Sequence, residues 1–110
     1  MSQFGFSTAA RFQRTAIHCS STGWTALEGS TALANRVGIE LYNKGQAATA
    51  KLYLTMTYNG ETPSGDAARV KFSKAIETGA YHFEPLGPGV TLWGRTHAAT
   101  ARVIVTEYGV

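Results

Sequence analysis

From residue 36 onward, apolar and polar residues alternate with a period of two. Neighbouring side chains on a β-strand point to opposite faces, so this alternation predicts half-buried strands. The alternating segments are separated by Asn, Gly and Pro residues, which are typical of turns. They are 36–42, about 49–58, 81–83, 90–93 and 100–108. Short strands at this spacing predict an all-β fold: a single antiparallel β-sandwich or jelly-roll-like domain.

The first two of these strands are predicted to pair with each other. On the first, Val37, Ile39 and Leu41 share one face. The residues that follow include Asn43 and Gly45, which tolerate positive φ and favour a tight turn. The turn therefore predicts an antiparallel pair. On the last strand, the inward residues are expected to be Ala101, Val103 and Val105.

The first 20 residues differ from the rest of the chain. They hold Phe4, Phe6 and Phe12 among small and basic residues, without sustained alternation before Ala16. Exposed Phe is costly, so these rings are expected to be buried, under the chain's own sheet or in a groove on a neighbour. We expect an N-terminal docking arm over 1–20 and a β-sandwich domain over 21–110. Residues 67–76 fit both a strand and a short helix, and both alternatives stay open.

The composition favours a component of an assembly over a free enzyme. Charged residues make up 15% of the chain, against about 25% in a typical domain. The net charge of +3 is scattered, whereas a nucleic-acid binder usually has a basic stripe or a recognisable module. The sequence has neither a secretory signal nor an apolar run approaching the ~20 residues of a membrane span. We expect no nucleic-acid or membrane partner and synthesis in the cytoplasm.

The His and Cys residues do not have the spacing of a metal or catalytic site. His18, His82 and His97 are far apart in the sequence, and a zinc site needs more ligands at closer spacing. His18 and Cys19 are adjacent, so a strand would point them to opposite faces. Cys19 is the single cysteine and cannot form an internal disulfide, so we expect it to be a small buried hydrophobe. We predict no enzyme activity, no metal and no cofactor.

The glutamates Glu40, Glu84 and Glu107 are the remaining candidates for acid–base chemistry. Isolated glutamates on strands are more often solvated, or fix the register by pairing with Lys or Arg. We interpret these residues as structural, with Arg36–Glu40 and Lys51 as candidates for such pairing.

The aromatic side chains have two possible roles. They could form a stacking platform for sugars or bases, or they could pack as cross-strand pairs and fill a subunit interface. The residues concerned are Tyr42, Tyr53, Tyr58, Tyr81, Trp24 and Trp93. The residues expected at an interface are Phe4, Phe6, Phe12, Trp24 and Trp93.

Three runs of sequence resemble a known layout: ANRVGIELYNKG at 34–45, PLGPGVTLW at 85–93 and TARVIVTEYG at 100–109. The chain is similar here to small β-sandwich accessory proteins of tailed bacteriophage virions, of the capsid decoration (cement) type. The resemblance covers roughly the last two-thirds of the chain, without residues 1–20 and with a longer loop at 59–80. The matching positions are Asn35, Arg36, Asn43, Gly45, Pro88, Gly89, Leu92, Trp93, Val103, Val105 and Glu107.

The resemblance implies a structural virion protein that bridges shell subunits and stabilises the phage head. It implies a place on the capsid surface after assembly in the host cytoplasm. The implied partners are the major capsid protein and/or copies of the chain itself, as a homo-oligomer. Two alternatives stay open: a receptor- or carbohydrate-binding module of a phage fibre or spike, and a head–tail neck component.

Overall fold

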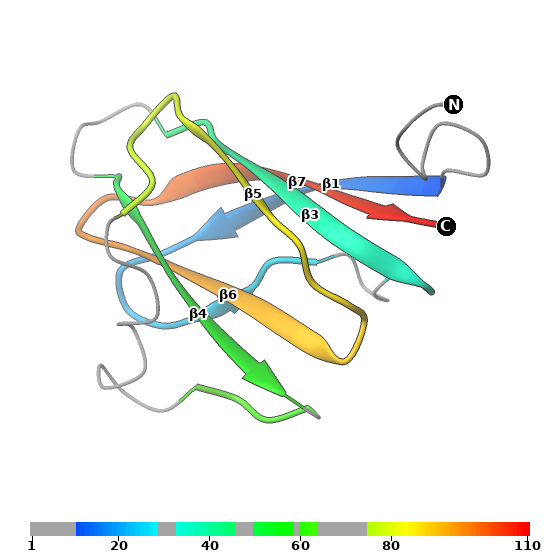
Figure 1. Ribbon diagram of the computed structural model, residues 1–110. Coiled ribbons are helices and arrows are strands. Elements are labelled where there is room, and N and C mark those ends of the chain that lie inside the picture. The colour runs from blue at the N-terminus through cyan, green and yellow to red at the C-terminus, as the bar shows by residue number, and fades with distance from the viewer. Residues whose placement is uncertain (1–10, 29–32, 46–49, 59, 64–74) are drawn as a thin grey trace.

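The computed structural model describes residues 11–28, 33–45, 50–58, 60–63 and 75–110. Within them the chain forms strands and no helix (Figure 1). The strands are β1 (Arg11–Cys19), β2 (Thr25–Ala26), β3 (Arg36–Asn43), β4 (Leu52–Tyr58), β5 (Tyr81–Glu84), β6 (Val90–Thr96) and β7 (Ala101–Gly109).

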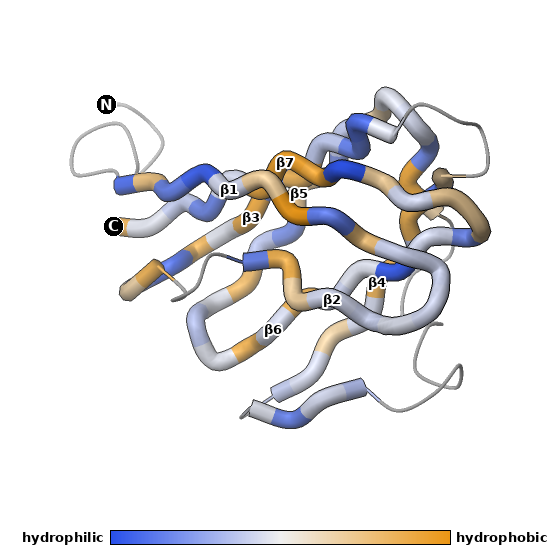
Figure 2. Tube along the Cα trace, turned by 180° about the vertical axis from the view of Figure 1, so that it is seen from behind, coloured by the Kyte–Doolittle hydropathy of each residue, from blue (hydrophilic) through white to orange (hydrophobic). Residues whose placement is uncertain are grey.

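The strands form two facing antiparallel sheets. The larger sheet has the order β1-β7-β3-β5, and the smaller has the order β2-β6-β4. Hydrophobic and hydrophilic residues alternate along the strands (Figure 2), as expected where one face of each sheet meets the other sheet and the opposite face is solvated. The predicted all-β, sandwich-like fold is confirmed.

The core lies between the two sheets. The side chains that fill it come from both layers and are at most 1% exposed: Leu27, Ile39, Leu41, Leu52, Leu92, Val103 and Val105. Burying one such side chain contributes about 1.5–3 kcal/mol, so this cluster is the main source of stability. The prediction that Ala101, Val103 and Val105 point inward is confirmed.

The predicted pairing of the first two strands is wrong. β3 lies between β7 and β5, whereas β4 pairs with β6 in the other sheet. The buried side chain of Asn43 explains the change of sheet. Its amide donates hydrogen bonds to the carbonyl oxygens of Ala50, at 2.8 Å, and Ile76, at 3.0 Å. The two hydrogen bonds hold the segment before β4 beside the end of β3, from where β4 continues in the smaller sheet and does not pair with β3.

The predicted face of Val37 is also wrong. Arg36 pairs with Gly109 and Gly38 with Tyr108, so Val37 is the extra residue of a β-bulge. A bulge shifts the alternation by one residue. Val37 is therefore 41% exposed and Arg36 only 2% exposed, although Ile39 and Leu41 face the core as predicted.

The predicted arm over 1–20 needs correction in its second half. β1 pairs with β7 from Arg11↔Gly109 to Cys19↔Ala101, so Arg11–Cys19 form an edge strand of the larger sheet. The hydrophobic signal of β1 is weak because the polar residues Gln13 and Thr15 occupy two of its inward positions. The backbone ladder with β7 and the packing of Ile17 and Cys19 on the core hold the strand in place. Residues 1–10 lie outside the described residues, as do 67–74 of the segment left open between strand and helix.

Candidate functional site

A buried ion pair between β3 and β7, neighbouring strands of the larger sheet, lies at one end of the sandwich. Arg36 Nη1 lies 3.0 Å from Glu107 Oε1, and both side chains are fully buried. A second carboxylate, that of Glu28, lies 3.3 Å from the same nitrogen. Arg36 Nη2 donates to the carbonyl oxygen of Gly87, at 2.8 Å, and to that of Val90. Arg36 on β3 is thereby tied to the start of β6 in the opposite sheet.

Glu107 is satisfied on both of its oxygens. Oε2 accepts a hydrogen bond from Gln13 Nε2 at 2.8 Å, and Oε1 accepts one from the backbone N–H of Leu33 at 3.1 Å. Glu107 therefore pairs with an arginine, which is one of the structural roles that we expected for the glutamates. The partner of Arg36 is Glu107, however, and not Glu40.

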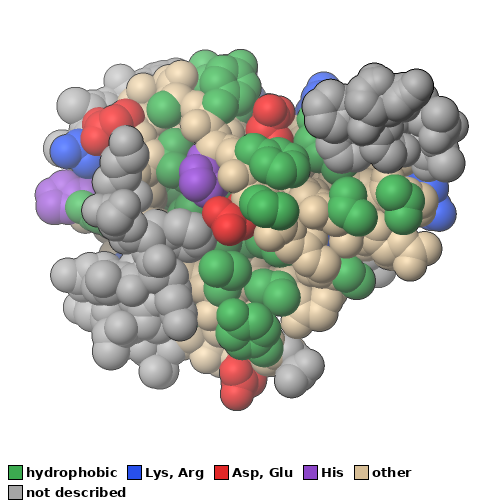
Figure 3. Space-filling view, in the orientation of Figure 1, with side chains coloured by type: hydrophobic (Ala, Val, Ile, Leu, Met, Phe, Trp, Pro, Cys, Tyr) green, Lys and Arg blue, Asp and Glu red, His purple; other side chains and the backbone are tan. Residues whose placement is uncertain are grey.

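The outer surface of the larger sheet carries a group of aromatic rings, which we call the aromatic face: Phe12, Tyr42, Tyr81, Phe83 and Tyr108. Phe12 is 64% exposed, Tyr81 66% and Phe83 47%. Tyr42 and Tyr81 stack with ring centroids 4.5 Å apart, and Phe83 lies 6.3 Å from Tyr108. Figure 3 shows hydrophobic side chains spread over the side of the molecule on which β3 and β5 lie.

A glycine and two charges complete the aromatic face. A Cβ atom on Gly38 would lie 2.4 Å from Phe83 Cζ, so only glycine allows this ring to rest on β3. Arg14 and Glu40 lie in the same row of the sheet, each opposite Thr106 of β7. They also line a shallow pocket of about 300 Å³ beside the Tyr42–Tyr81 stack.

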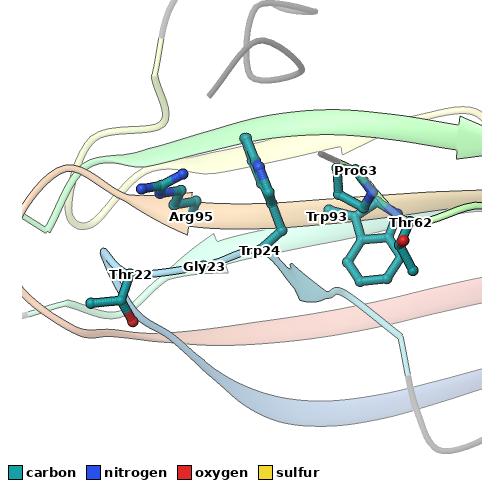
Figure 4. Close-up of a pocket in the computed structure, with 7 residues that line it drawn as sticks. All are labelled: Thr22, Gly23, Trp24, Thr62, Pro63, Trp93 and Arg95. Atoms are coloured by element: carbon teal, nitrogen blue, oxygen red, sulfur yellow. The ribbon is translucent and has the colours of Figure 1, made fainter. Parts of the chain in front are cut away.

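A second pocket, the tryptophan pocket, lies on the outer side of the smaller sheet (Figure 4). Its volume is about 310 Å³. Trp93 Nε1 donates to Thr57 Oγ1 at 2.8 Å, and Arg95 Nε donates to the carbonyl oxygen of Ser21 at 3.1 Å. The Arg95 guanidinium also lies 6.0 Å from the centre of the Trp24 ring. The residues that line the pocket are Thr22, Gly23, Trp24, Thr62, Pro63, Trp93 and Arg95.

The five expected interface residues do not form one surface. Phe12 lies on the aromatic face of the larger sheet, whereas Trp24 and Trp93 meet in the tryptophan pocket on the smaller sheet. Phe4 and Phe6 lie outside the described residues. The sequence analysis did not include Phe83 among the candidate interface residues. Its position two residues after Tyr81 on the same strand was the available signal, because residues two apart on a strand share a face.

The described residues lack a group of three or more His, Cys, Asp and Glu side chains that could hold a metal ion. Cys19 is fully buried, as predicted, and burial raises the pKa of its thiol from 9.0 to about 12. The thiol therefore stays protonated at neutral pH, and the nucleophilic thiolate is not formed. His18, next to it, is exposed on the other face of β1.

Comparison with known proteins finds a likeness in fold but none in sequence family. Neither a family model nor a curated protein matches the sequence. A solved structure from the Bacillus endospore appendages, which form a novel family of disulfide-linked pili, matches with a TM-score of 0.50 and 14% sequence identity. The match covers 92% of this chain and 88% of that chain. This likeness establishes the fold alone. In the part of the chain that the structure describes, we find no helix with the length and hydropathy of a membrane span.

Proposed function

We propose that this protein is a structural subunit of a phage virion, a decoration (cement) subunit that binds the capsid surface through its aromatic face. The observation that supports this most strongly is the exposure of Phe12, Tyr81 and Phe83 on one side of one sheet. Clustered exposed aromatic rings are typical of surfaces that contact other proteins. The resemblance of the sequence to decoration proteins supports the same role.

The aromatic face is suited to binding because its rings are already packed. Tyr42 and Tyr81 stack on each other, and Phe83 rests on Gly38. Immobilising a flexible side chain at an interface costs about 0.5–1.5 kcal/mol, and pre-packed rings avoid much of this cost. The sheet behind them is held by the core, so a partner meets a rigid surface.

The size of the aromatic face favours a repeated contact over a single tight one. Four strands, about 4.8 Å apart and about 3.3 Å per residue, give a face on the order of 500 Å². A standard interface buries about 800 Å² on each partner, so contacts at the rim of the sheet must supply the remainder. In a capsid lattice, many such contacts act together, and multivalency strengthens the attachment.

The partners we propose are the major capsid protein and other copies of this chain. Arg14 and Glu40 place opposite charges on the same face, so that in a two-fold contact the Arg14 of one copy could meet the Glu40 of the other. The related fold comes from disulfide-linked pili, but the single cysteine of this sequence is buried as Cys19. We therefore propose an assembly held by non-covalent contacts.

The test is to measure binding to purified phage heads with a variant of the aromatic face. Tyr81→Thr combined with Phe83→Thr keeps the β-propensity of β5 but removes both rings. The double variant is expected to bind at least tenfold more weakly and to be lost from purified particles, as counted by quantitative mass spectrometry. Tyr58→Thr is the matched control, because Tyr58 is 52% exposed on the other sheet. Wild-type binding by the double variant, or absence of the unaltered protein from particles, would refute the proposal.

A further inference from the structure

The tryptophan pocket has the composition of a small-ligand site. Its volume of about 310 Å³ falls at the lower end of the range of roughly 300–1,000 Å³ that is usual for such sites. Two indole rings and Pro63 supply apolar walls, and Thr22 and Thr62 supply hydroxyl groups. In Figure 4, Trp24 stands between Arg95 on one side and Trp93 with Pro63 on the other.

The groups of this pocket are held in place by the protein itself. Trp93 is fixed by its hydrogen bond to Thr57, and Arg95 by its hydrogen bond to the carbonyl oxygen of Ser21. The position of Arg95 beside the Trp24 ring adds a cation–π contact. A site that is ordered before binding spares a ligand the cost of ordering it.

We propose that this pocket binds an acidic sugar, a pyranose ring that carries a carboxylate. One face of a pyranose presents C–H groups that stack on an indole ring, and its edge presents hydroxyl groups that hydrogen-bond to threonine. Among the described residues that line the pocket, Arg95 is the charged one. A guanidinium binds a carboxylate with strong, charge-assisted hydrogen bonds. The pocket therefore favours an acidic sugar over a neutral one.

The charge of the pocket also favours a sugar over a nucleic acid. Binding of single-stranded nucleic acid combines stacked aromatic rings with a basic groove that follows the phosphates. The tryptophan pocket offers the stacking rings but a single cation, Arg95, among its described lining residues. A single guanidinium can balance the charge of one carboxylate, but it cannot balance the negative charges of several successive phosphates.

The position of the pocket makes sugar binding compatible with assembly. The aromatic face belongs to the β1-β7-β3-β5 sheet, whereas Trp93 and Arg95 are on β6 of the other sheet. A subunit attached through the aromatic face would keep the pocket open to a glycan on a cell surface. The sugar site does not depend on the capsid role, and each is tested by its own variant.

The experiment is a titration of the full chain with glucuronic acid, followed by tryptophan fluorescence. The sequence contains two tryptophans, and both line the pocket, so the signal reports this site directly. We expect a saturable change with a Kd on the order of millimolar, and at least tenfold weaker binding of glucose. Arg95→Gln is expected to lose about tenfold in affinity for glucuronic acid, the effect of one charge-assisted hydrogen bond.

Three variants make the titration decisive. Arg102→Gln removes an exposed arginine of β7 and is the matched control, expected to bind glucuronic acid as the unaltered chain does. Trp24→Ala should abolish binding of either sugar. Trp24→Phe keeps an aromatic ring and should still bind glucuronic acid, and it replaces the alanine variant in the test if that variant fails to fold. Absence of saturation, equal affinity for glucose, or tighter binding of a mononucleotide would each overturn the proposal.

Discussion

Replacing Glu107 with glutamine tests how the sandwich is held together. The substitution keeps the size of the side chain but removes its charge. Arg36 then remains fully buried without the carboxylate that lies 3.0 Å from its Nη1 atom. Removing one partner of a buried ion pair costs about 3–5 kcal/mol, because the remaining charge is buried without compensation.

The carboxylate of Glu28, which remains beside Arg36 in this variant, determines how much stability is lost. Glu28 Oε1 lies 3.3 Å from the same arginine nitrogen, and its side chain is 22% exposed. It can compensate part of the charge of Arg36, so we expect Glu107→Gln to lower the free energy of unfolding by about 3 kcal/mol. For a domain of this size, the melting temperature should fall by on the order of 10–20 °C.

Urea denaturation followed by circular dichroism measures this difference. The matched control is Glu77→Gln, because Glu77 and Lys51 form an exposed pair at 3.8 Å, and such pairs contribute about 0–1 kcal/mol. Combining Arg36→Met with Glu107→Gln should cost less than the sum of the two single changes, by about 1–3 kcal/mol. An equal decrease in the free energy of unfolding for Glu107→Gln and Glu77→Gln would refute the reasoning.

The other two predictions concern Gly38 and Cys19. Gly38→Ala should push the exposed Phe83 ring away from β3, so that capsid binding falls severalfold while the free energy of unfolding changes by about 1 kcal/mol or less. Unchanged binding in the assay used for Tyr81→Thr/Phe83→Thr would contradict this. Cys19 should react with a thiol reagent at pH 8 only after unfolding, and fast labelling of the folded chain would contradict its burial. Because its folded pKa is raised from 9.0 to about 12, its contribution to stability is complete below pH 9 and should be lost as the pH rises toward 12.

From residue 36 onward, the sequence was sufficient to predict where the strands lie but not how they pair. Alternation located the strands from residue 36 onward because one face of each is buried. The pairing of β3 was missed because Asn43 bonds to Ile76, far along the chain, and turn chemistry near Asn43 carries no information on this contact. β1 was assigned to an arm because its inward positions include Gln13, which binds Glu107 instead of apolar neighbours.

The sequence indicated several of the residues that belong to the candidate sites, but not which of them lie together in the structure. Trp24 and Trp93 were recognised as candidates, but only the pairing of β2 with β6 places them beside Arg95. Phe12 was grouped with them, although it belongs to the opposite sheet. The ion pair of Arg36 was missed because the bulge at Val37 turns the arginine inward, whereas Val37, Ile39 and Leu41 continue a regular alternation in the sequence that gives no sign of the bulge.

The pairing of Arg11 with Gly109 places the beginning of β1 beside the end of β7. A pulling force applied at these two points would open the strands like a zipper, loading one pair of hydrogen bonds at a time. Each such bond contributes only about 0.5–1.5 kcal/mol, so the sandwich resists tension weakly along this line. In the proposed capsid role, a load would therefore have to enter the subunit elsewhere. The aromatic face has residues on all four strands of the larger sheet, so a partner bound there would pull on several strands together and not on the pair β1 and β7 alone.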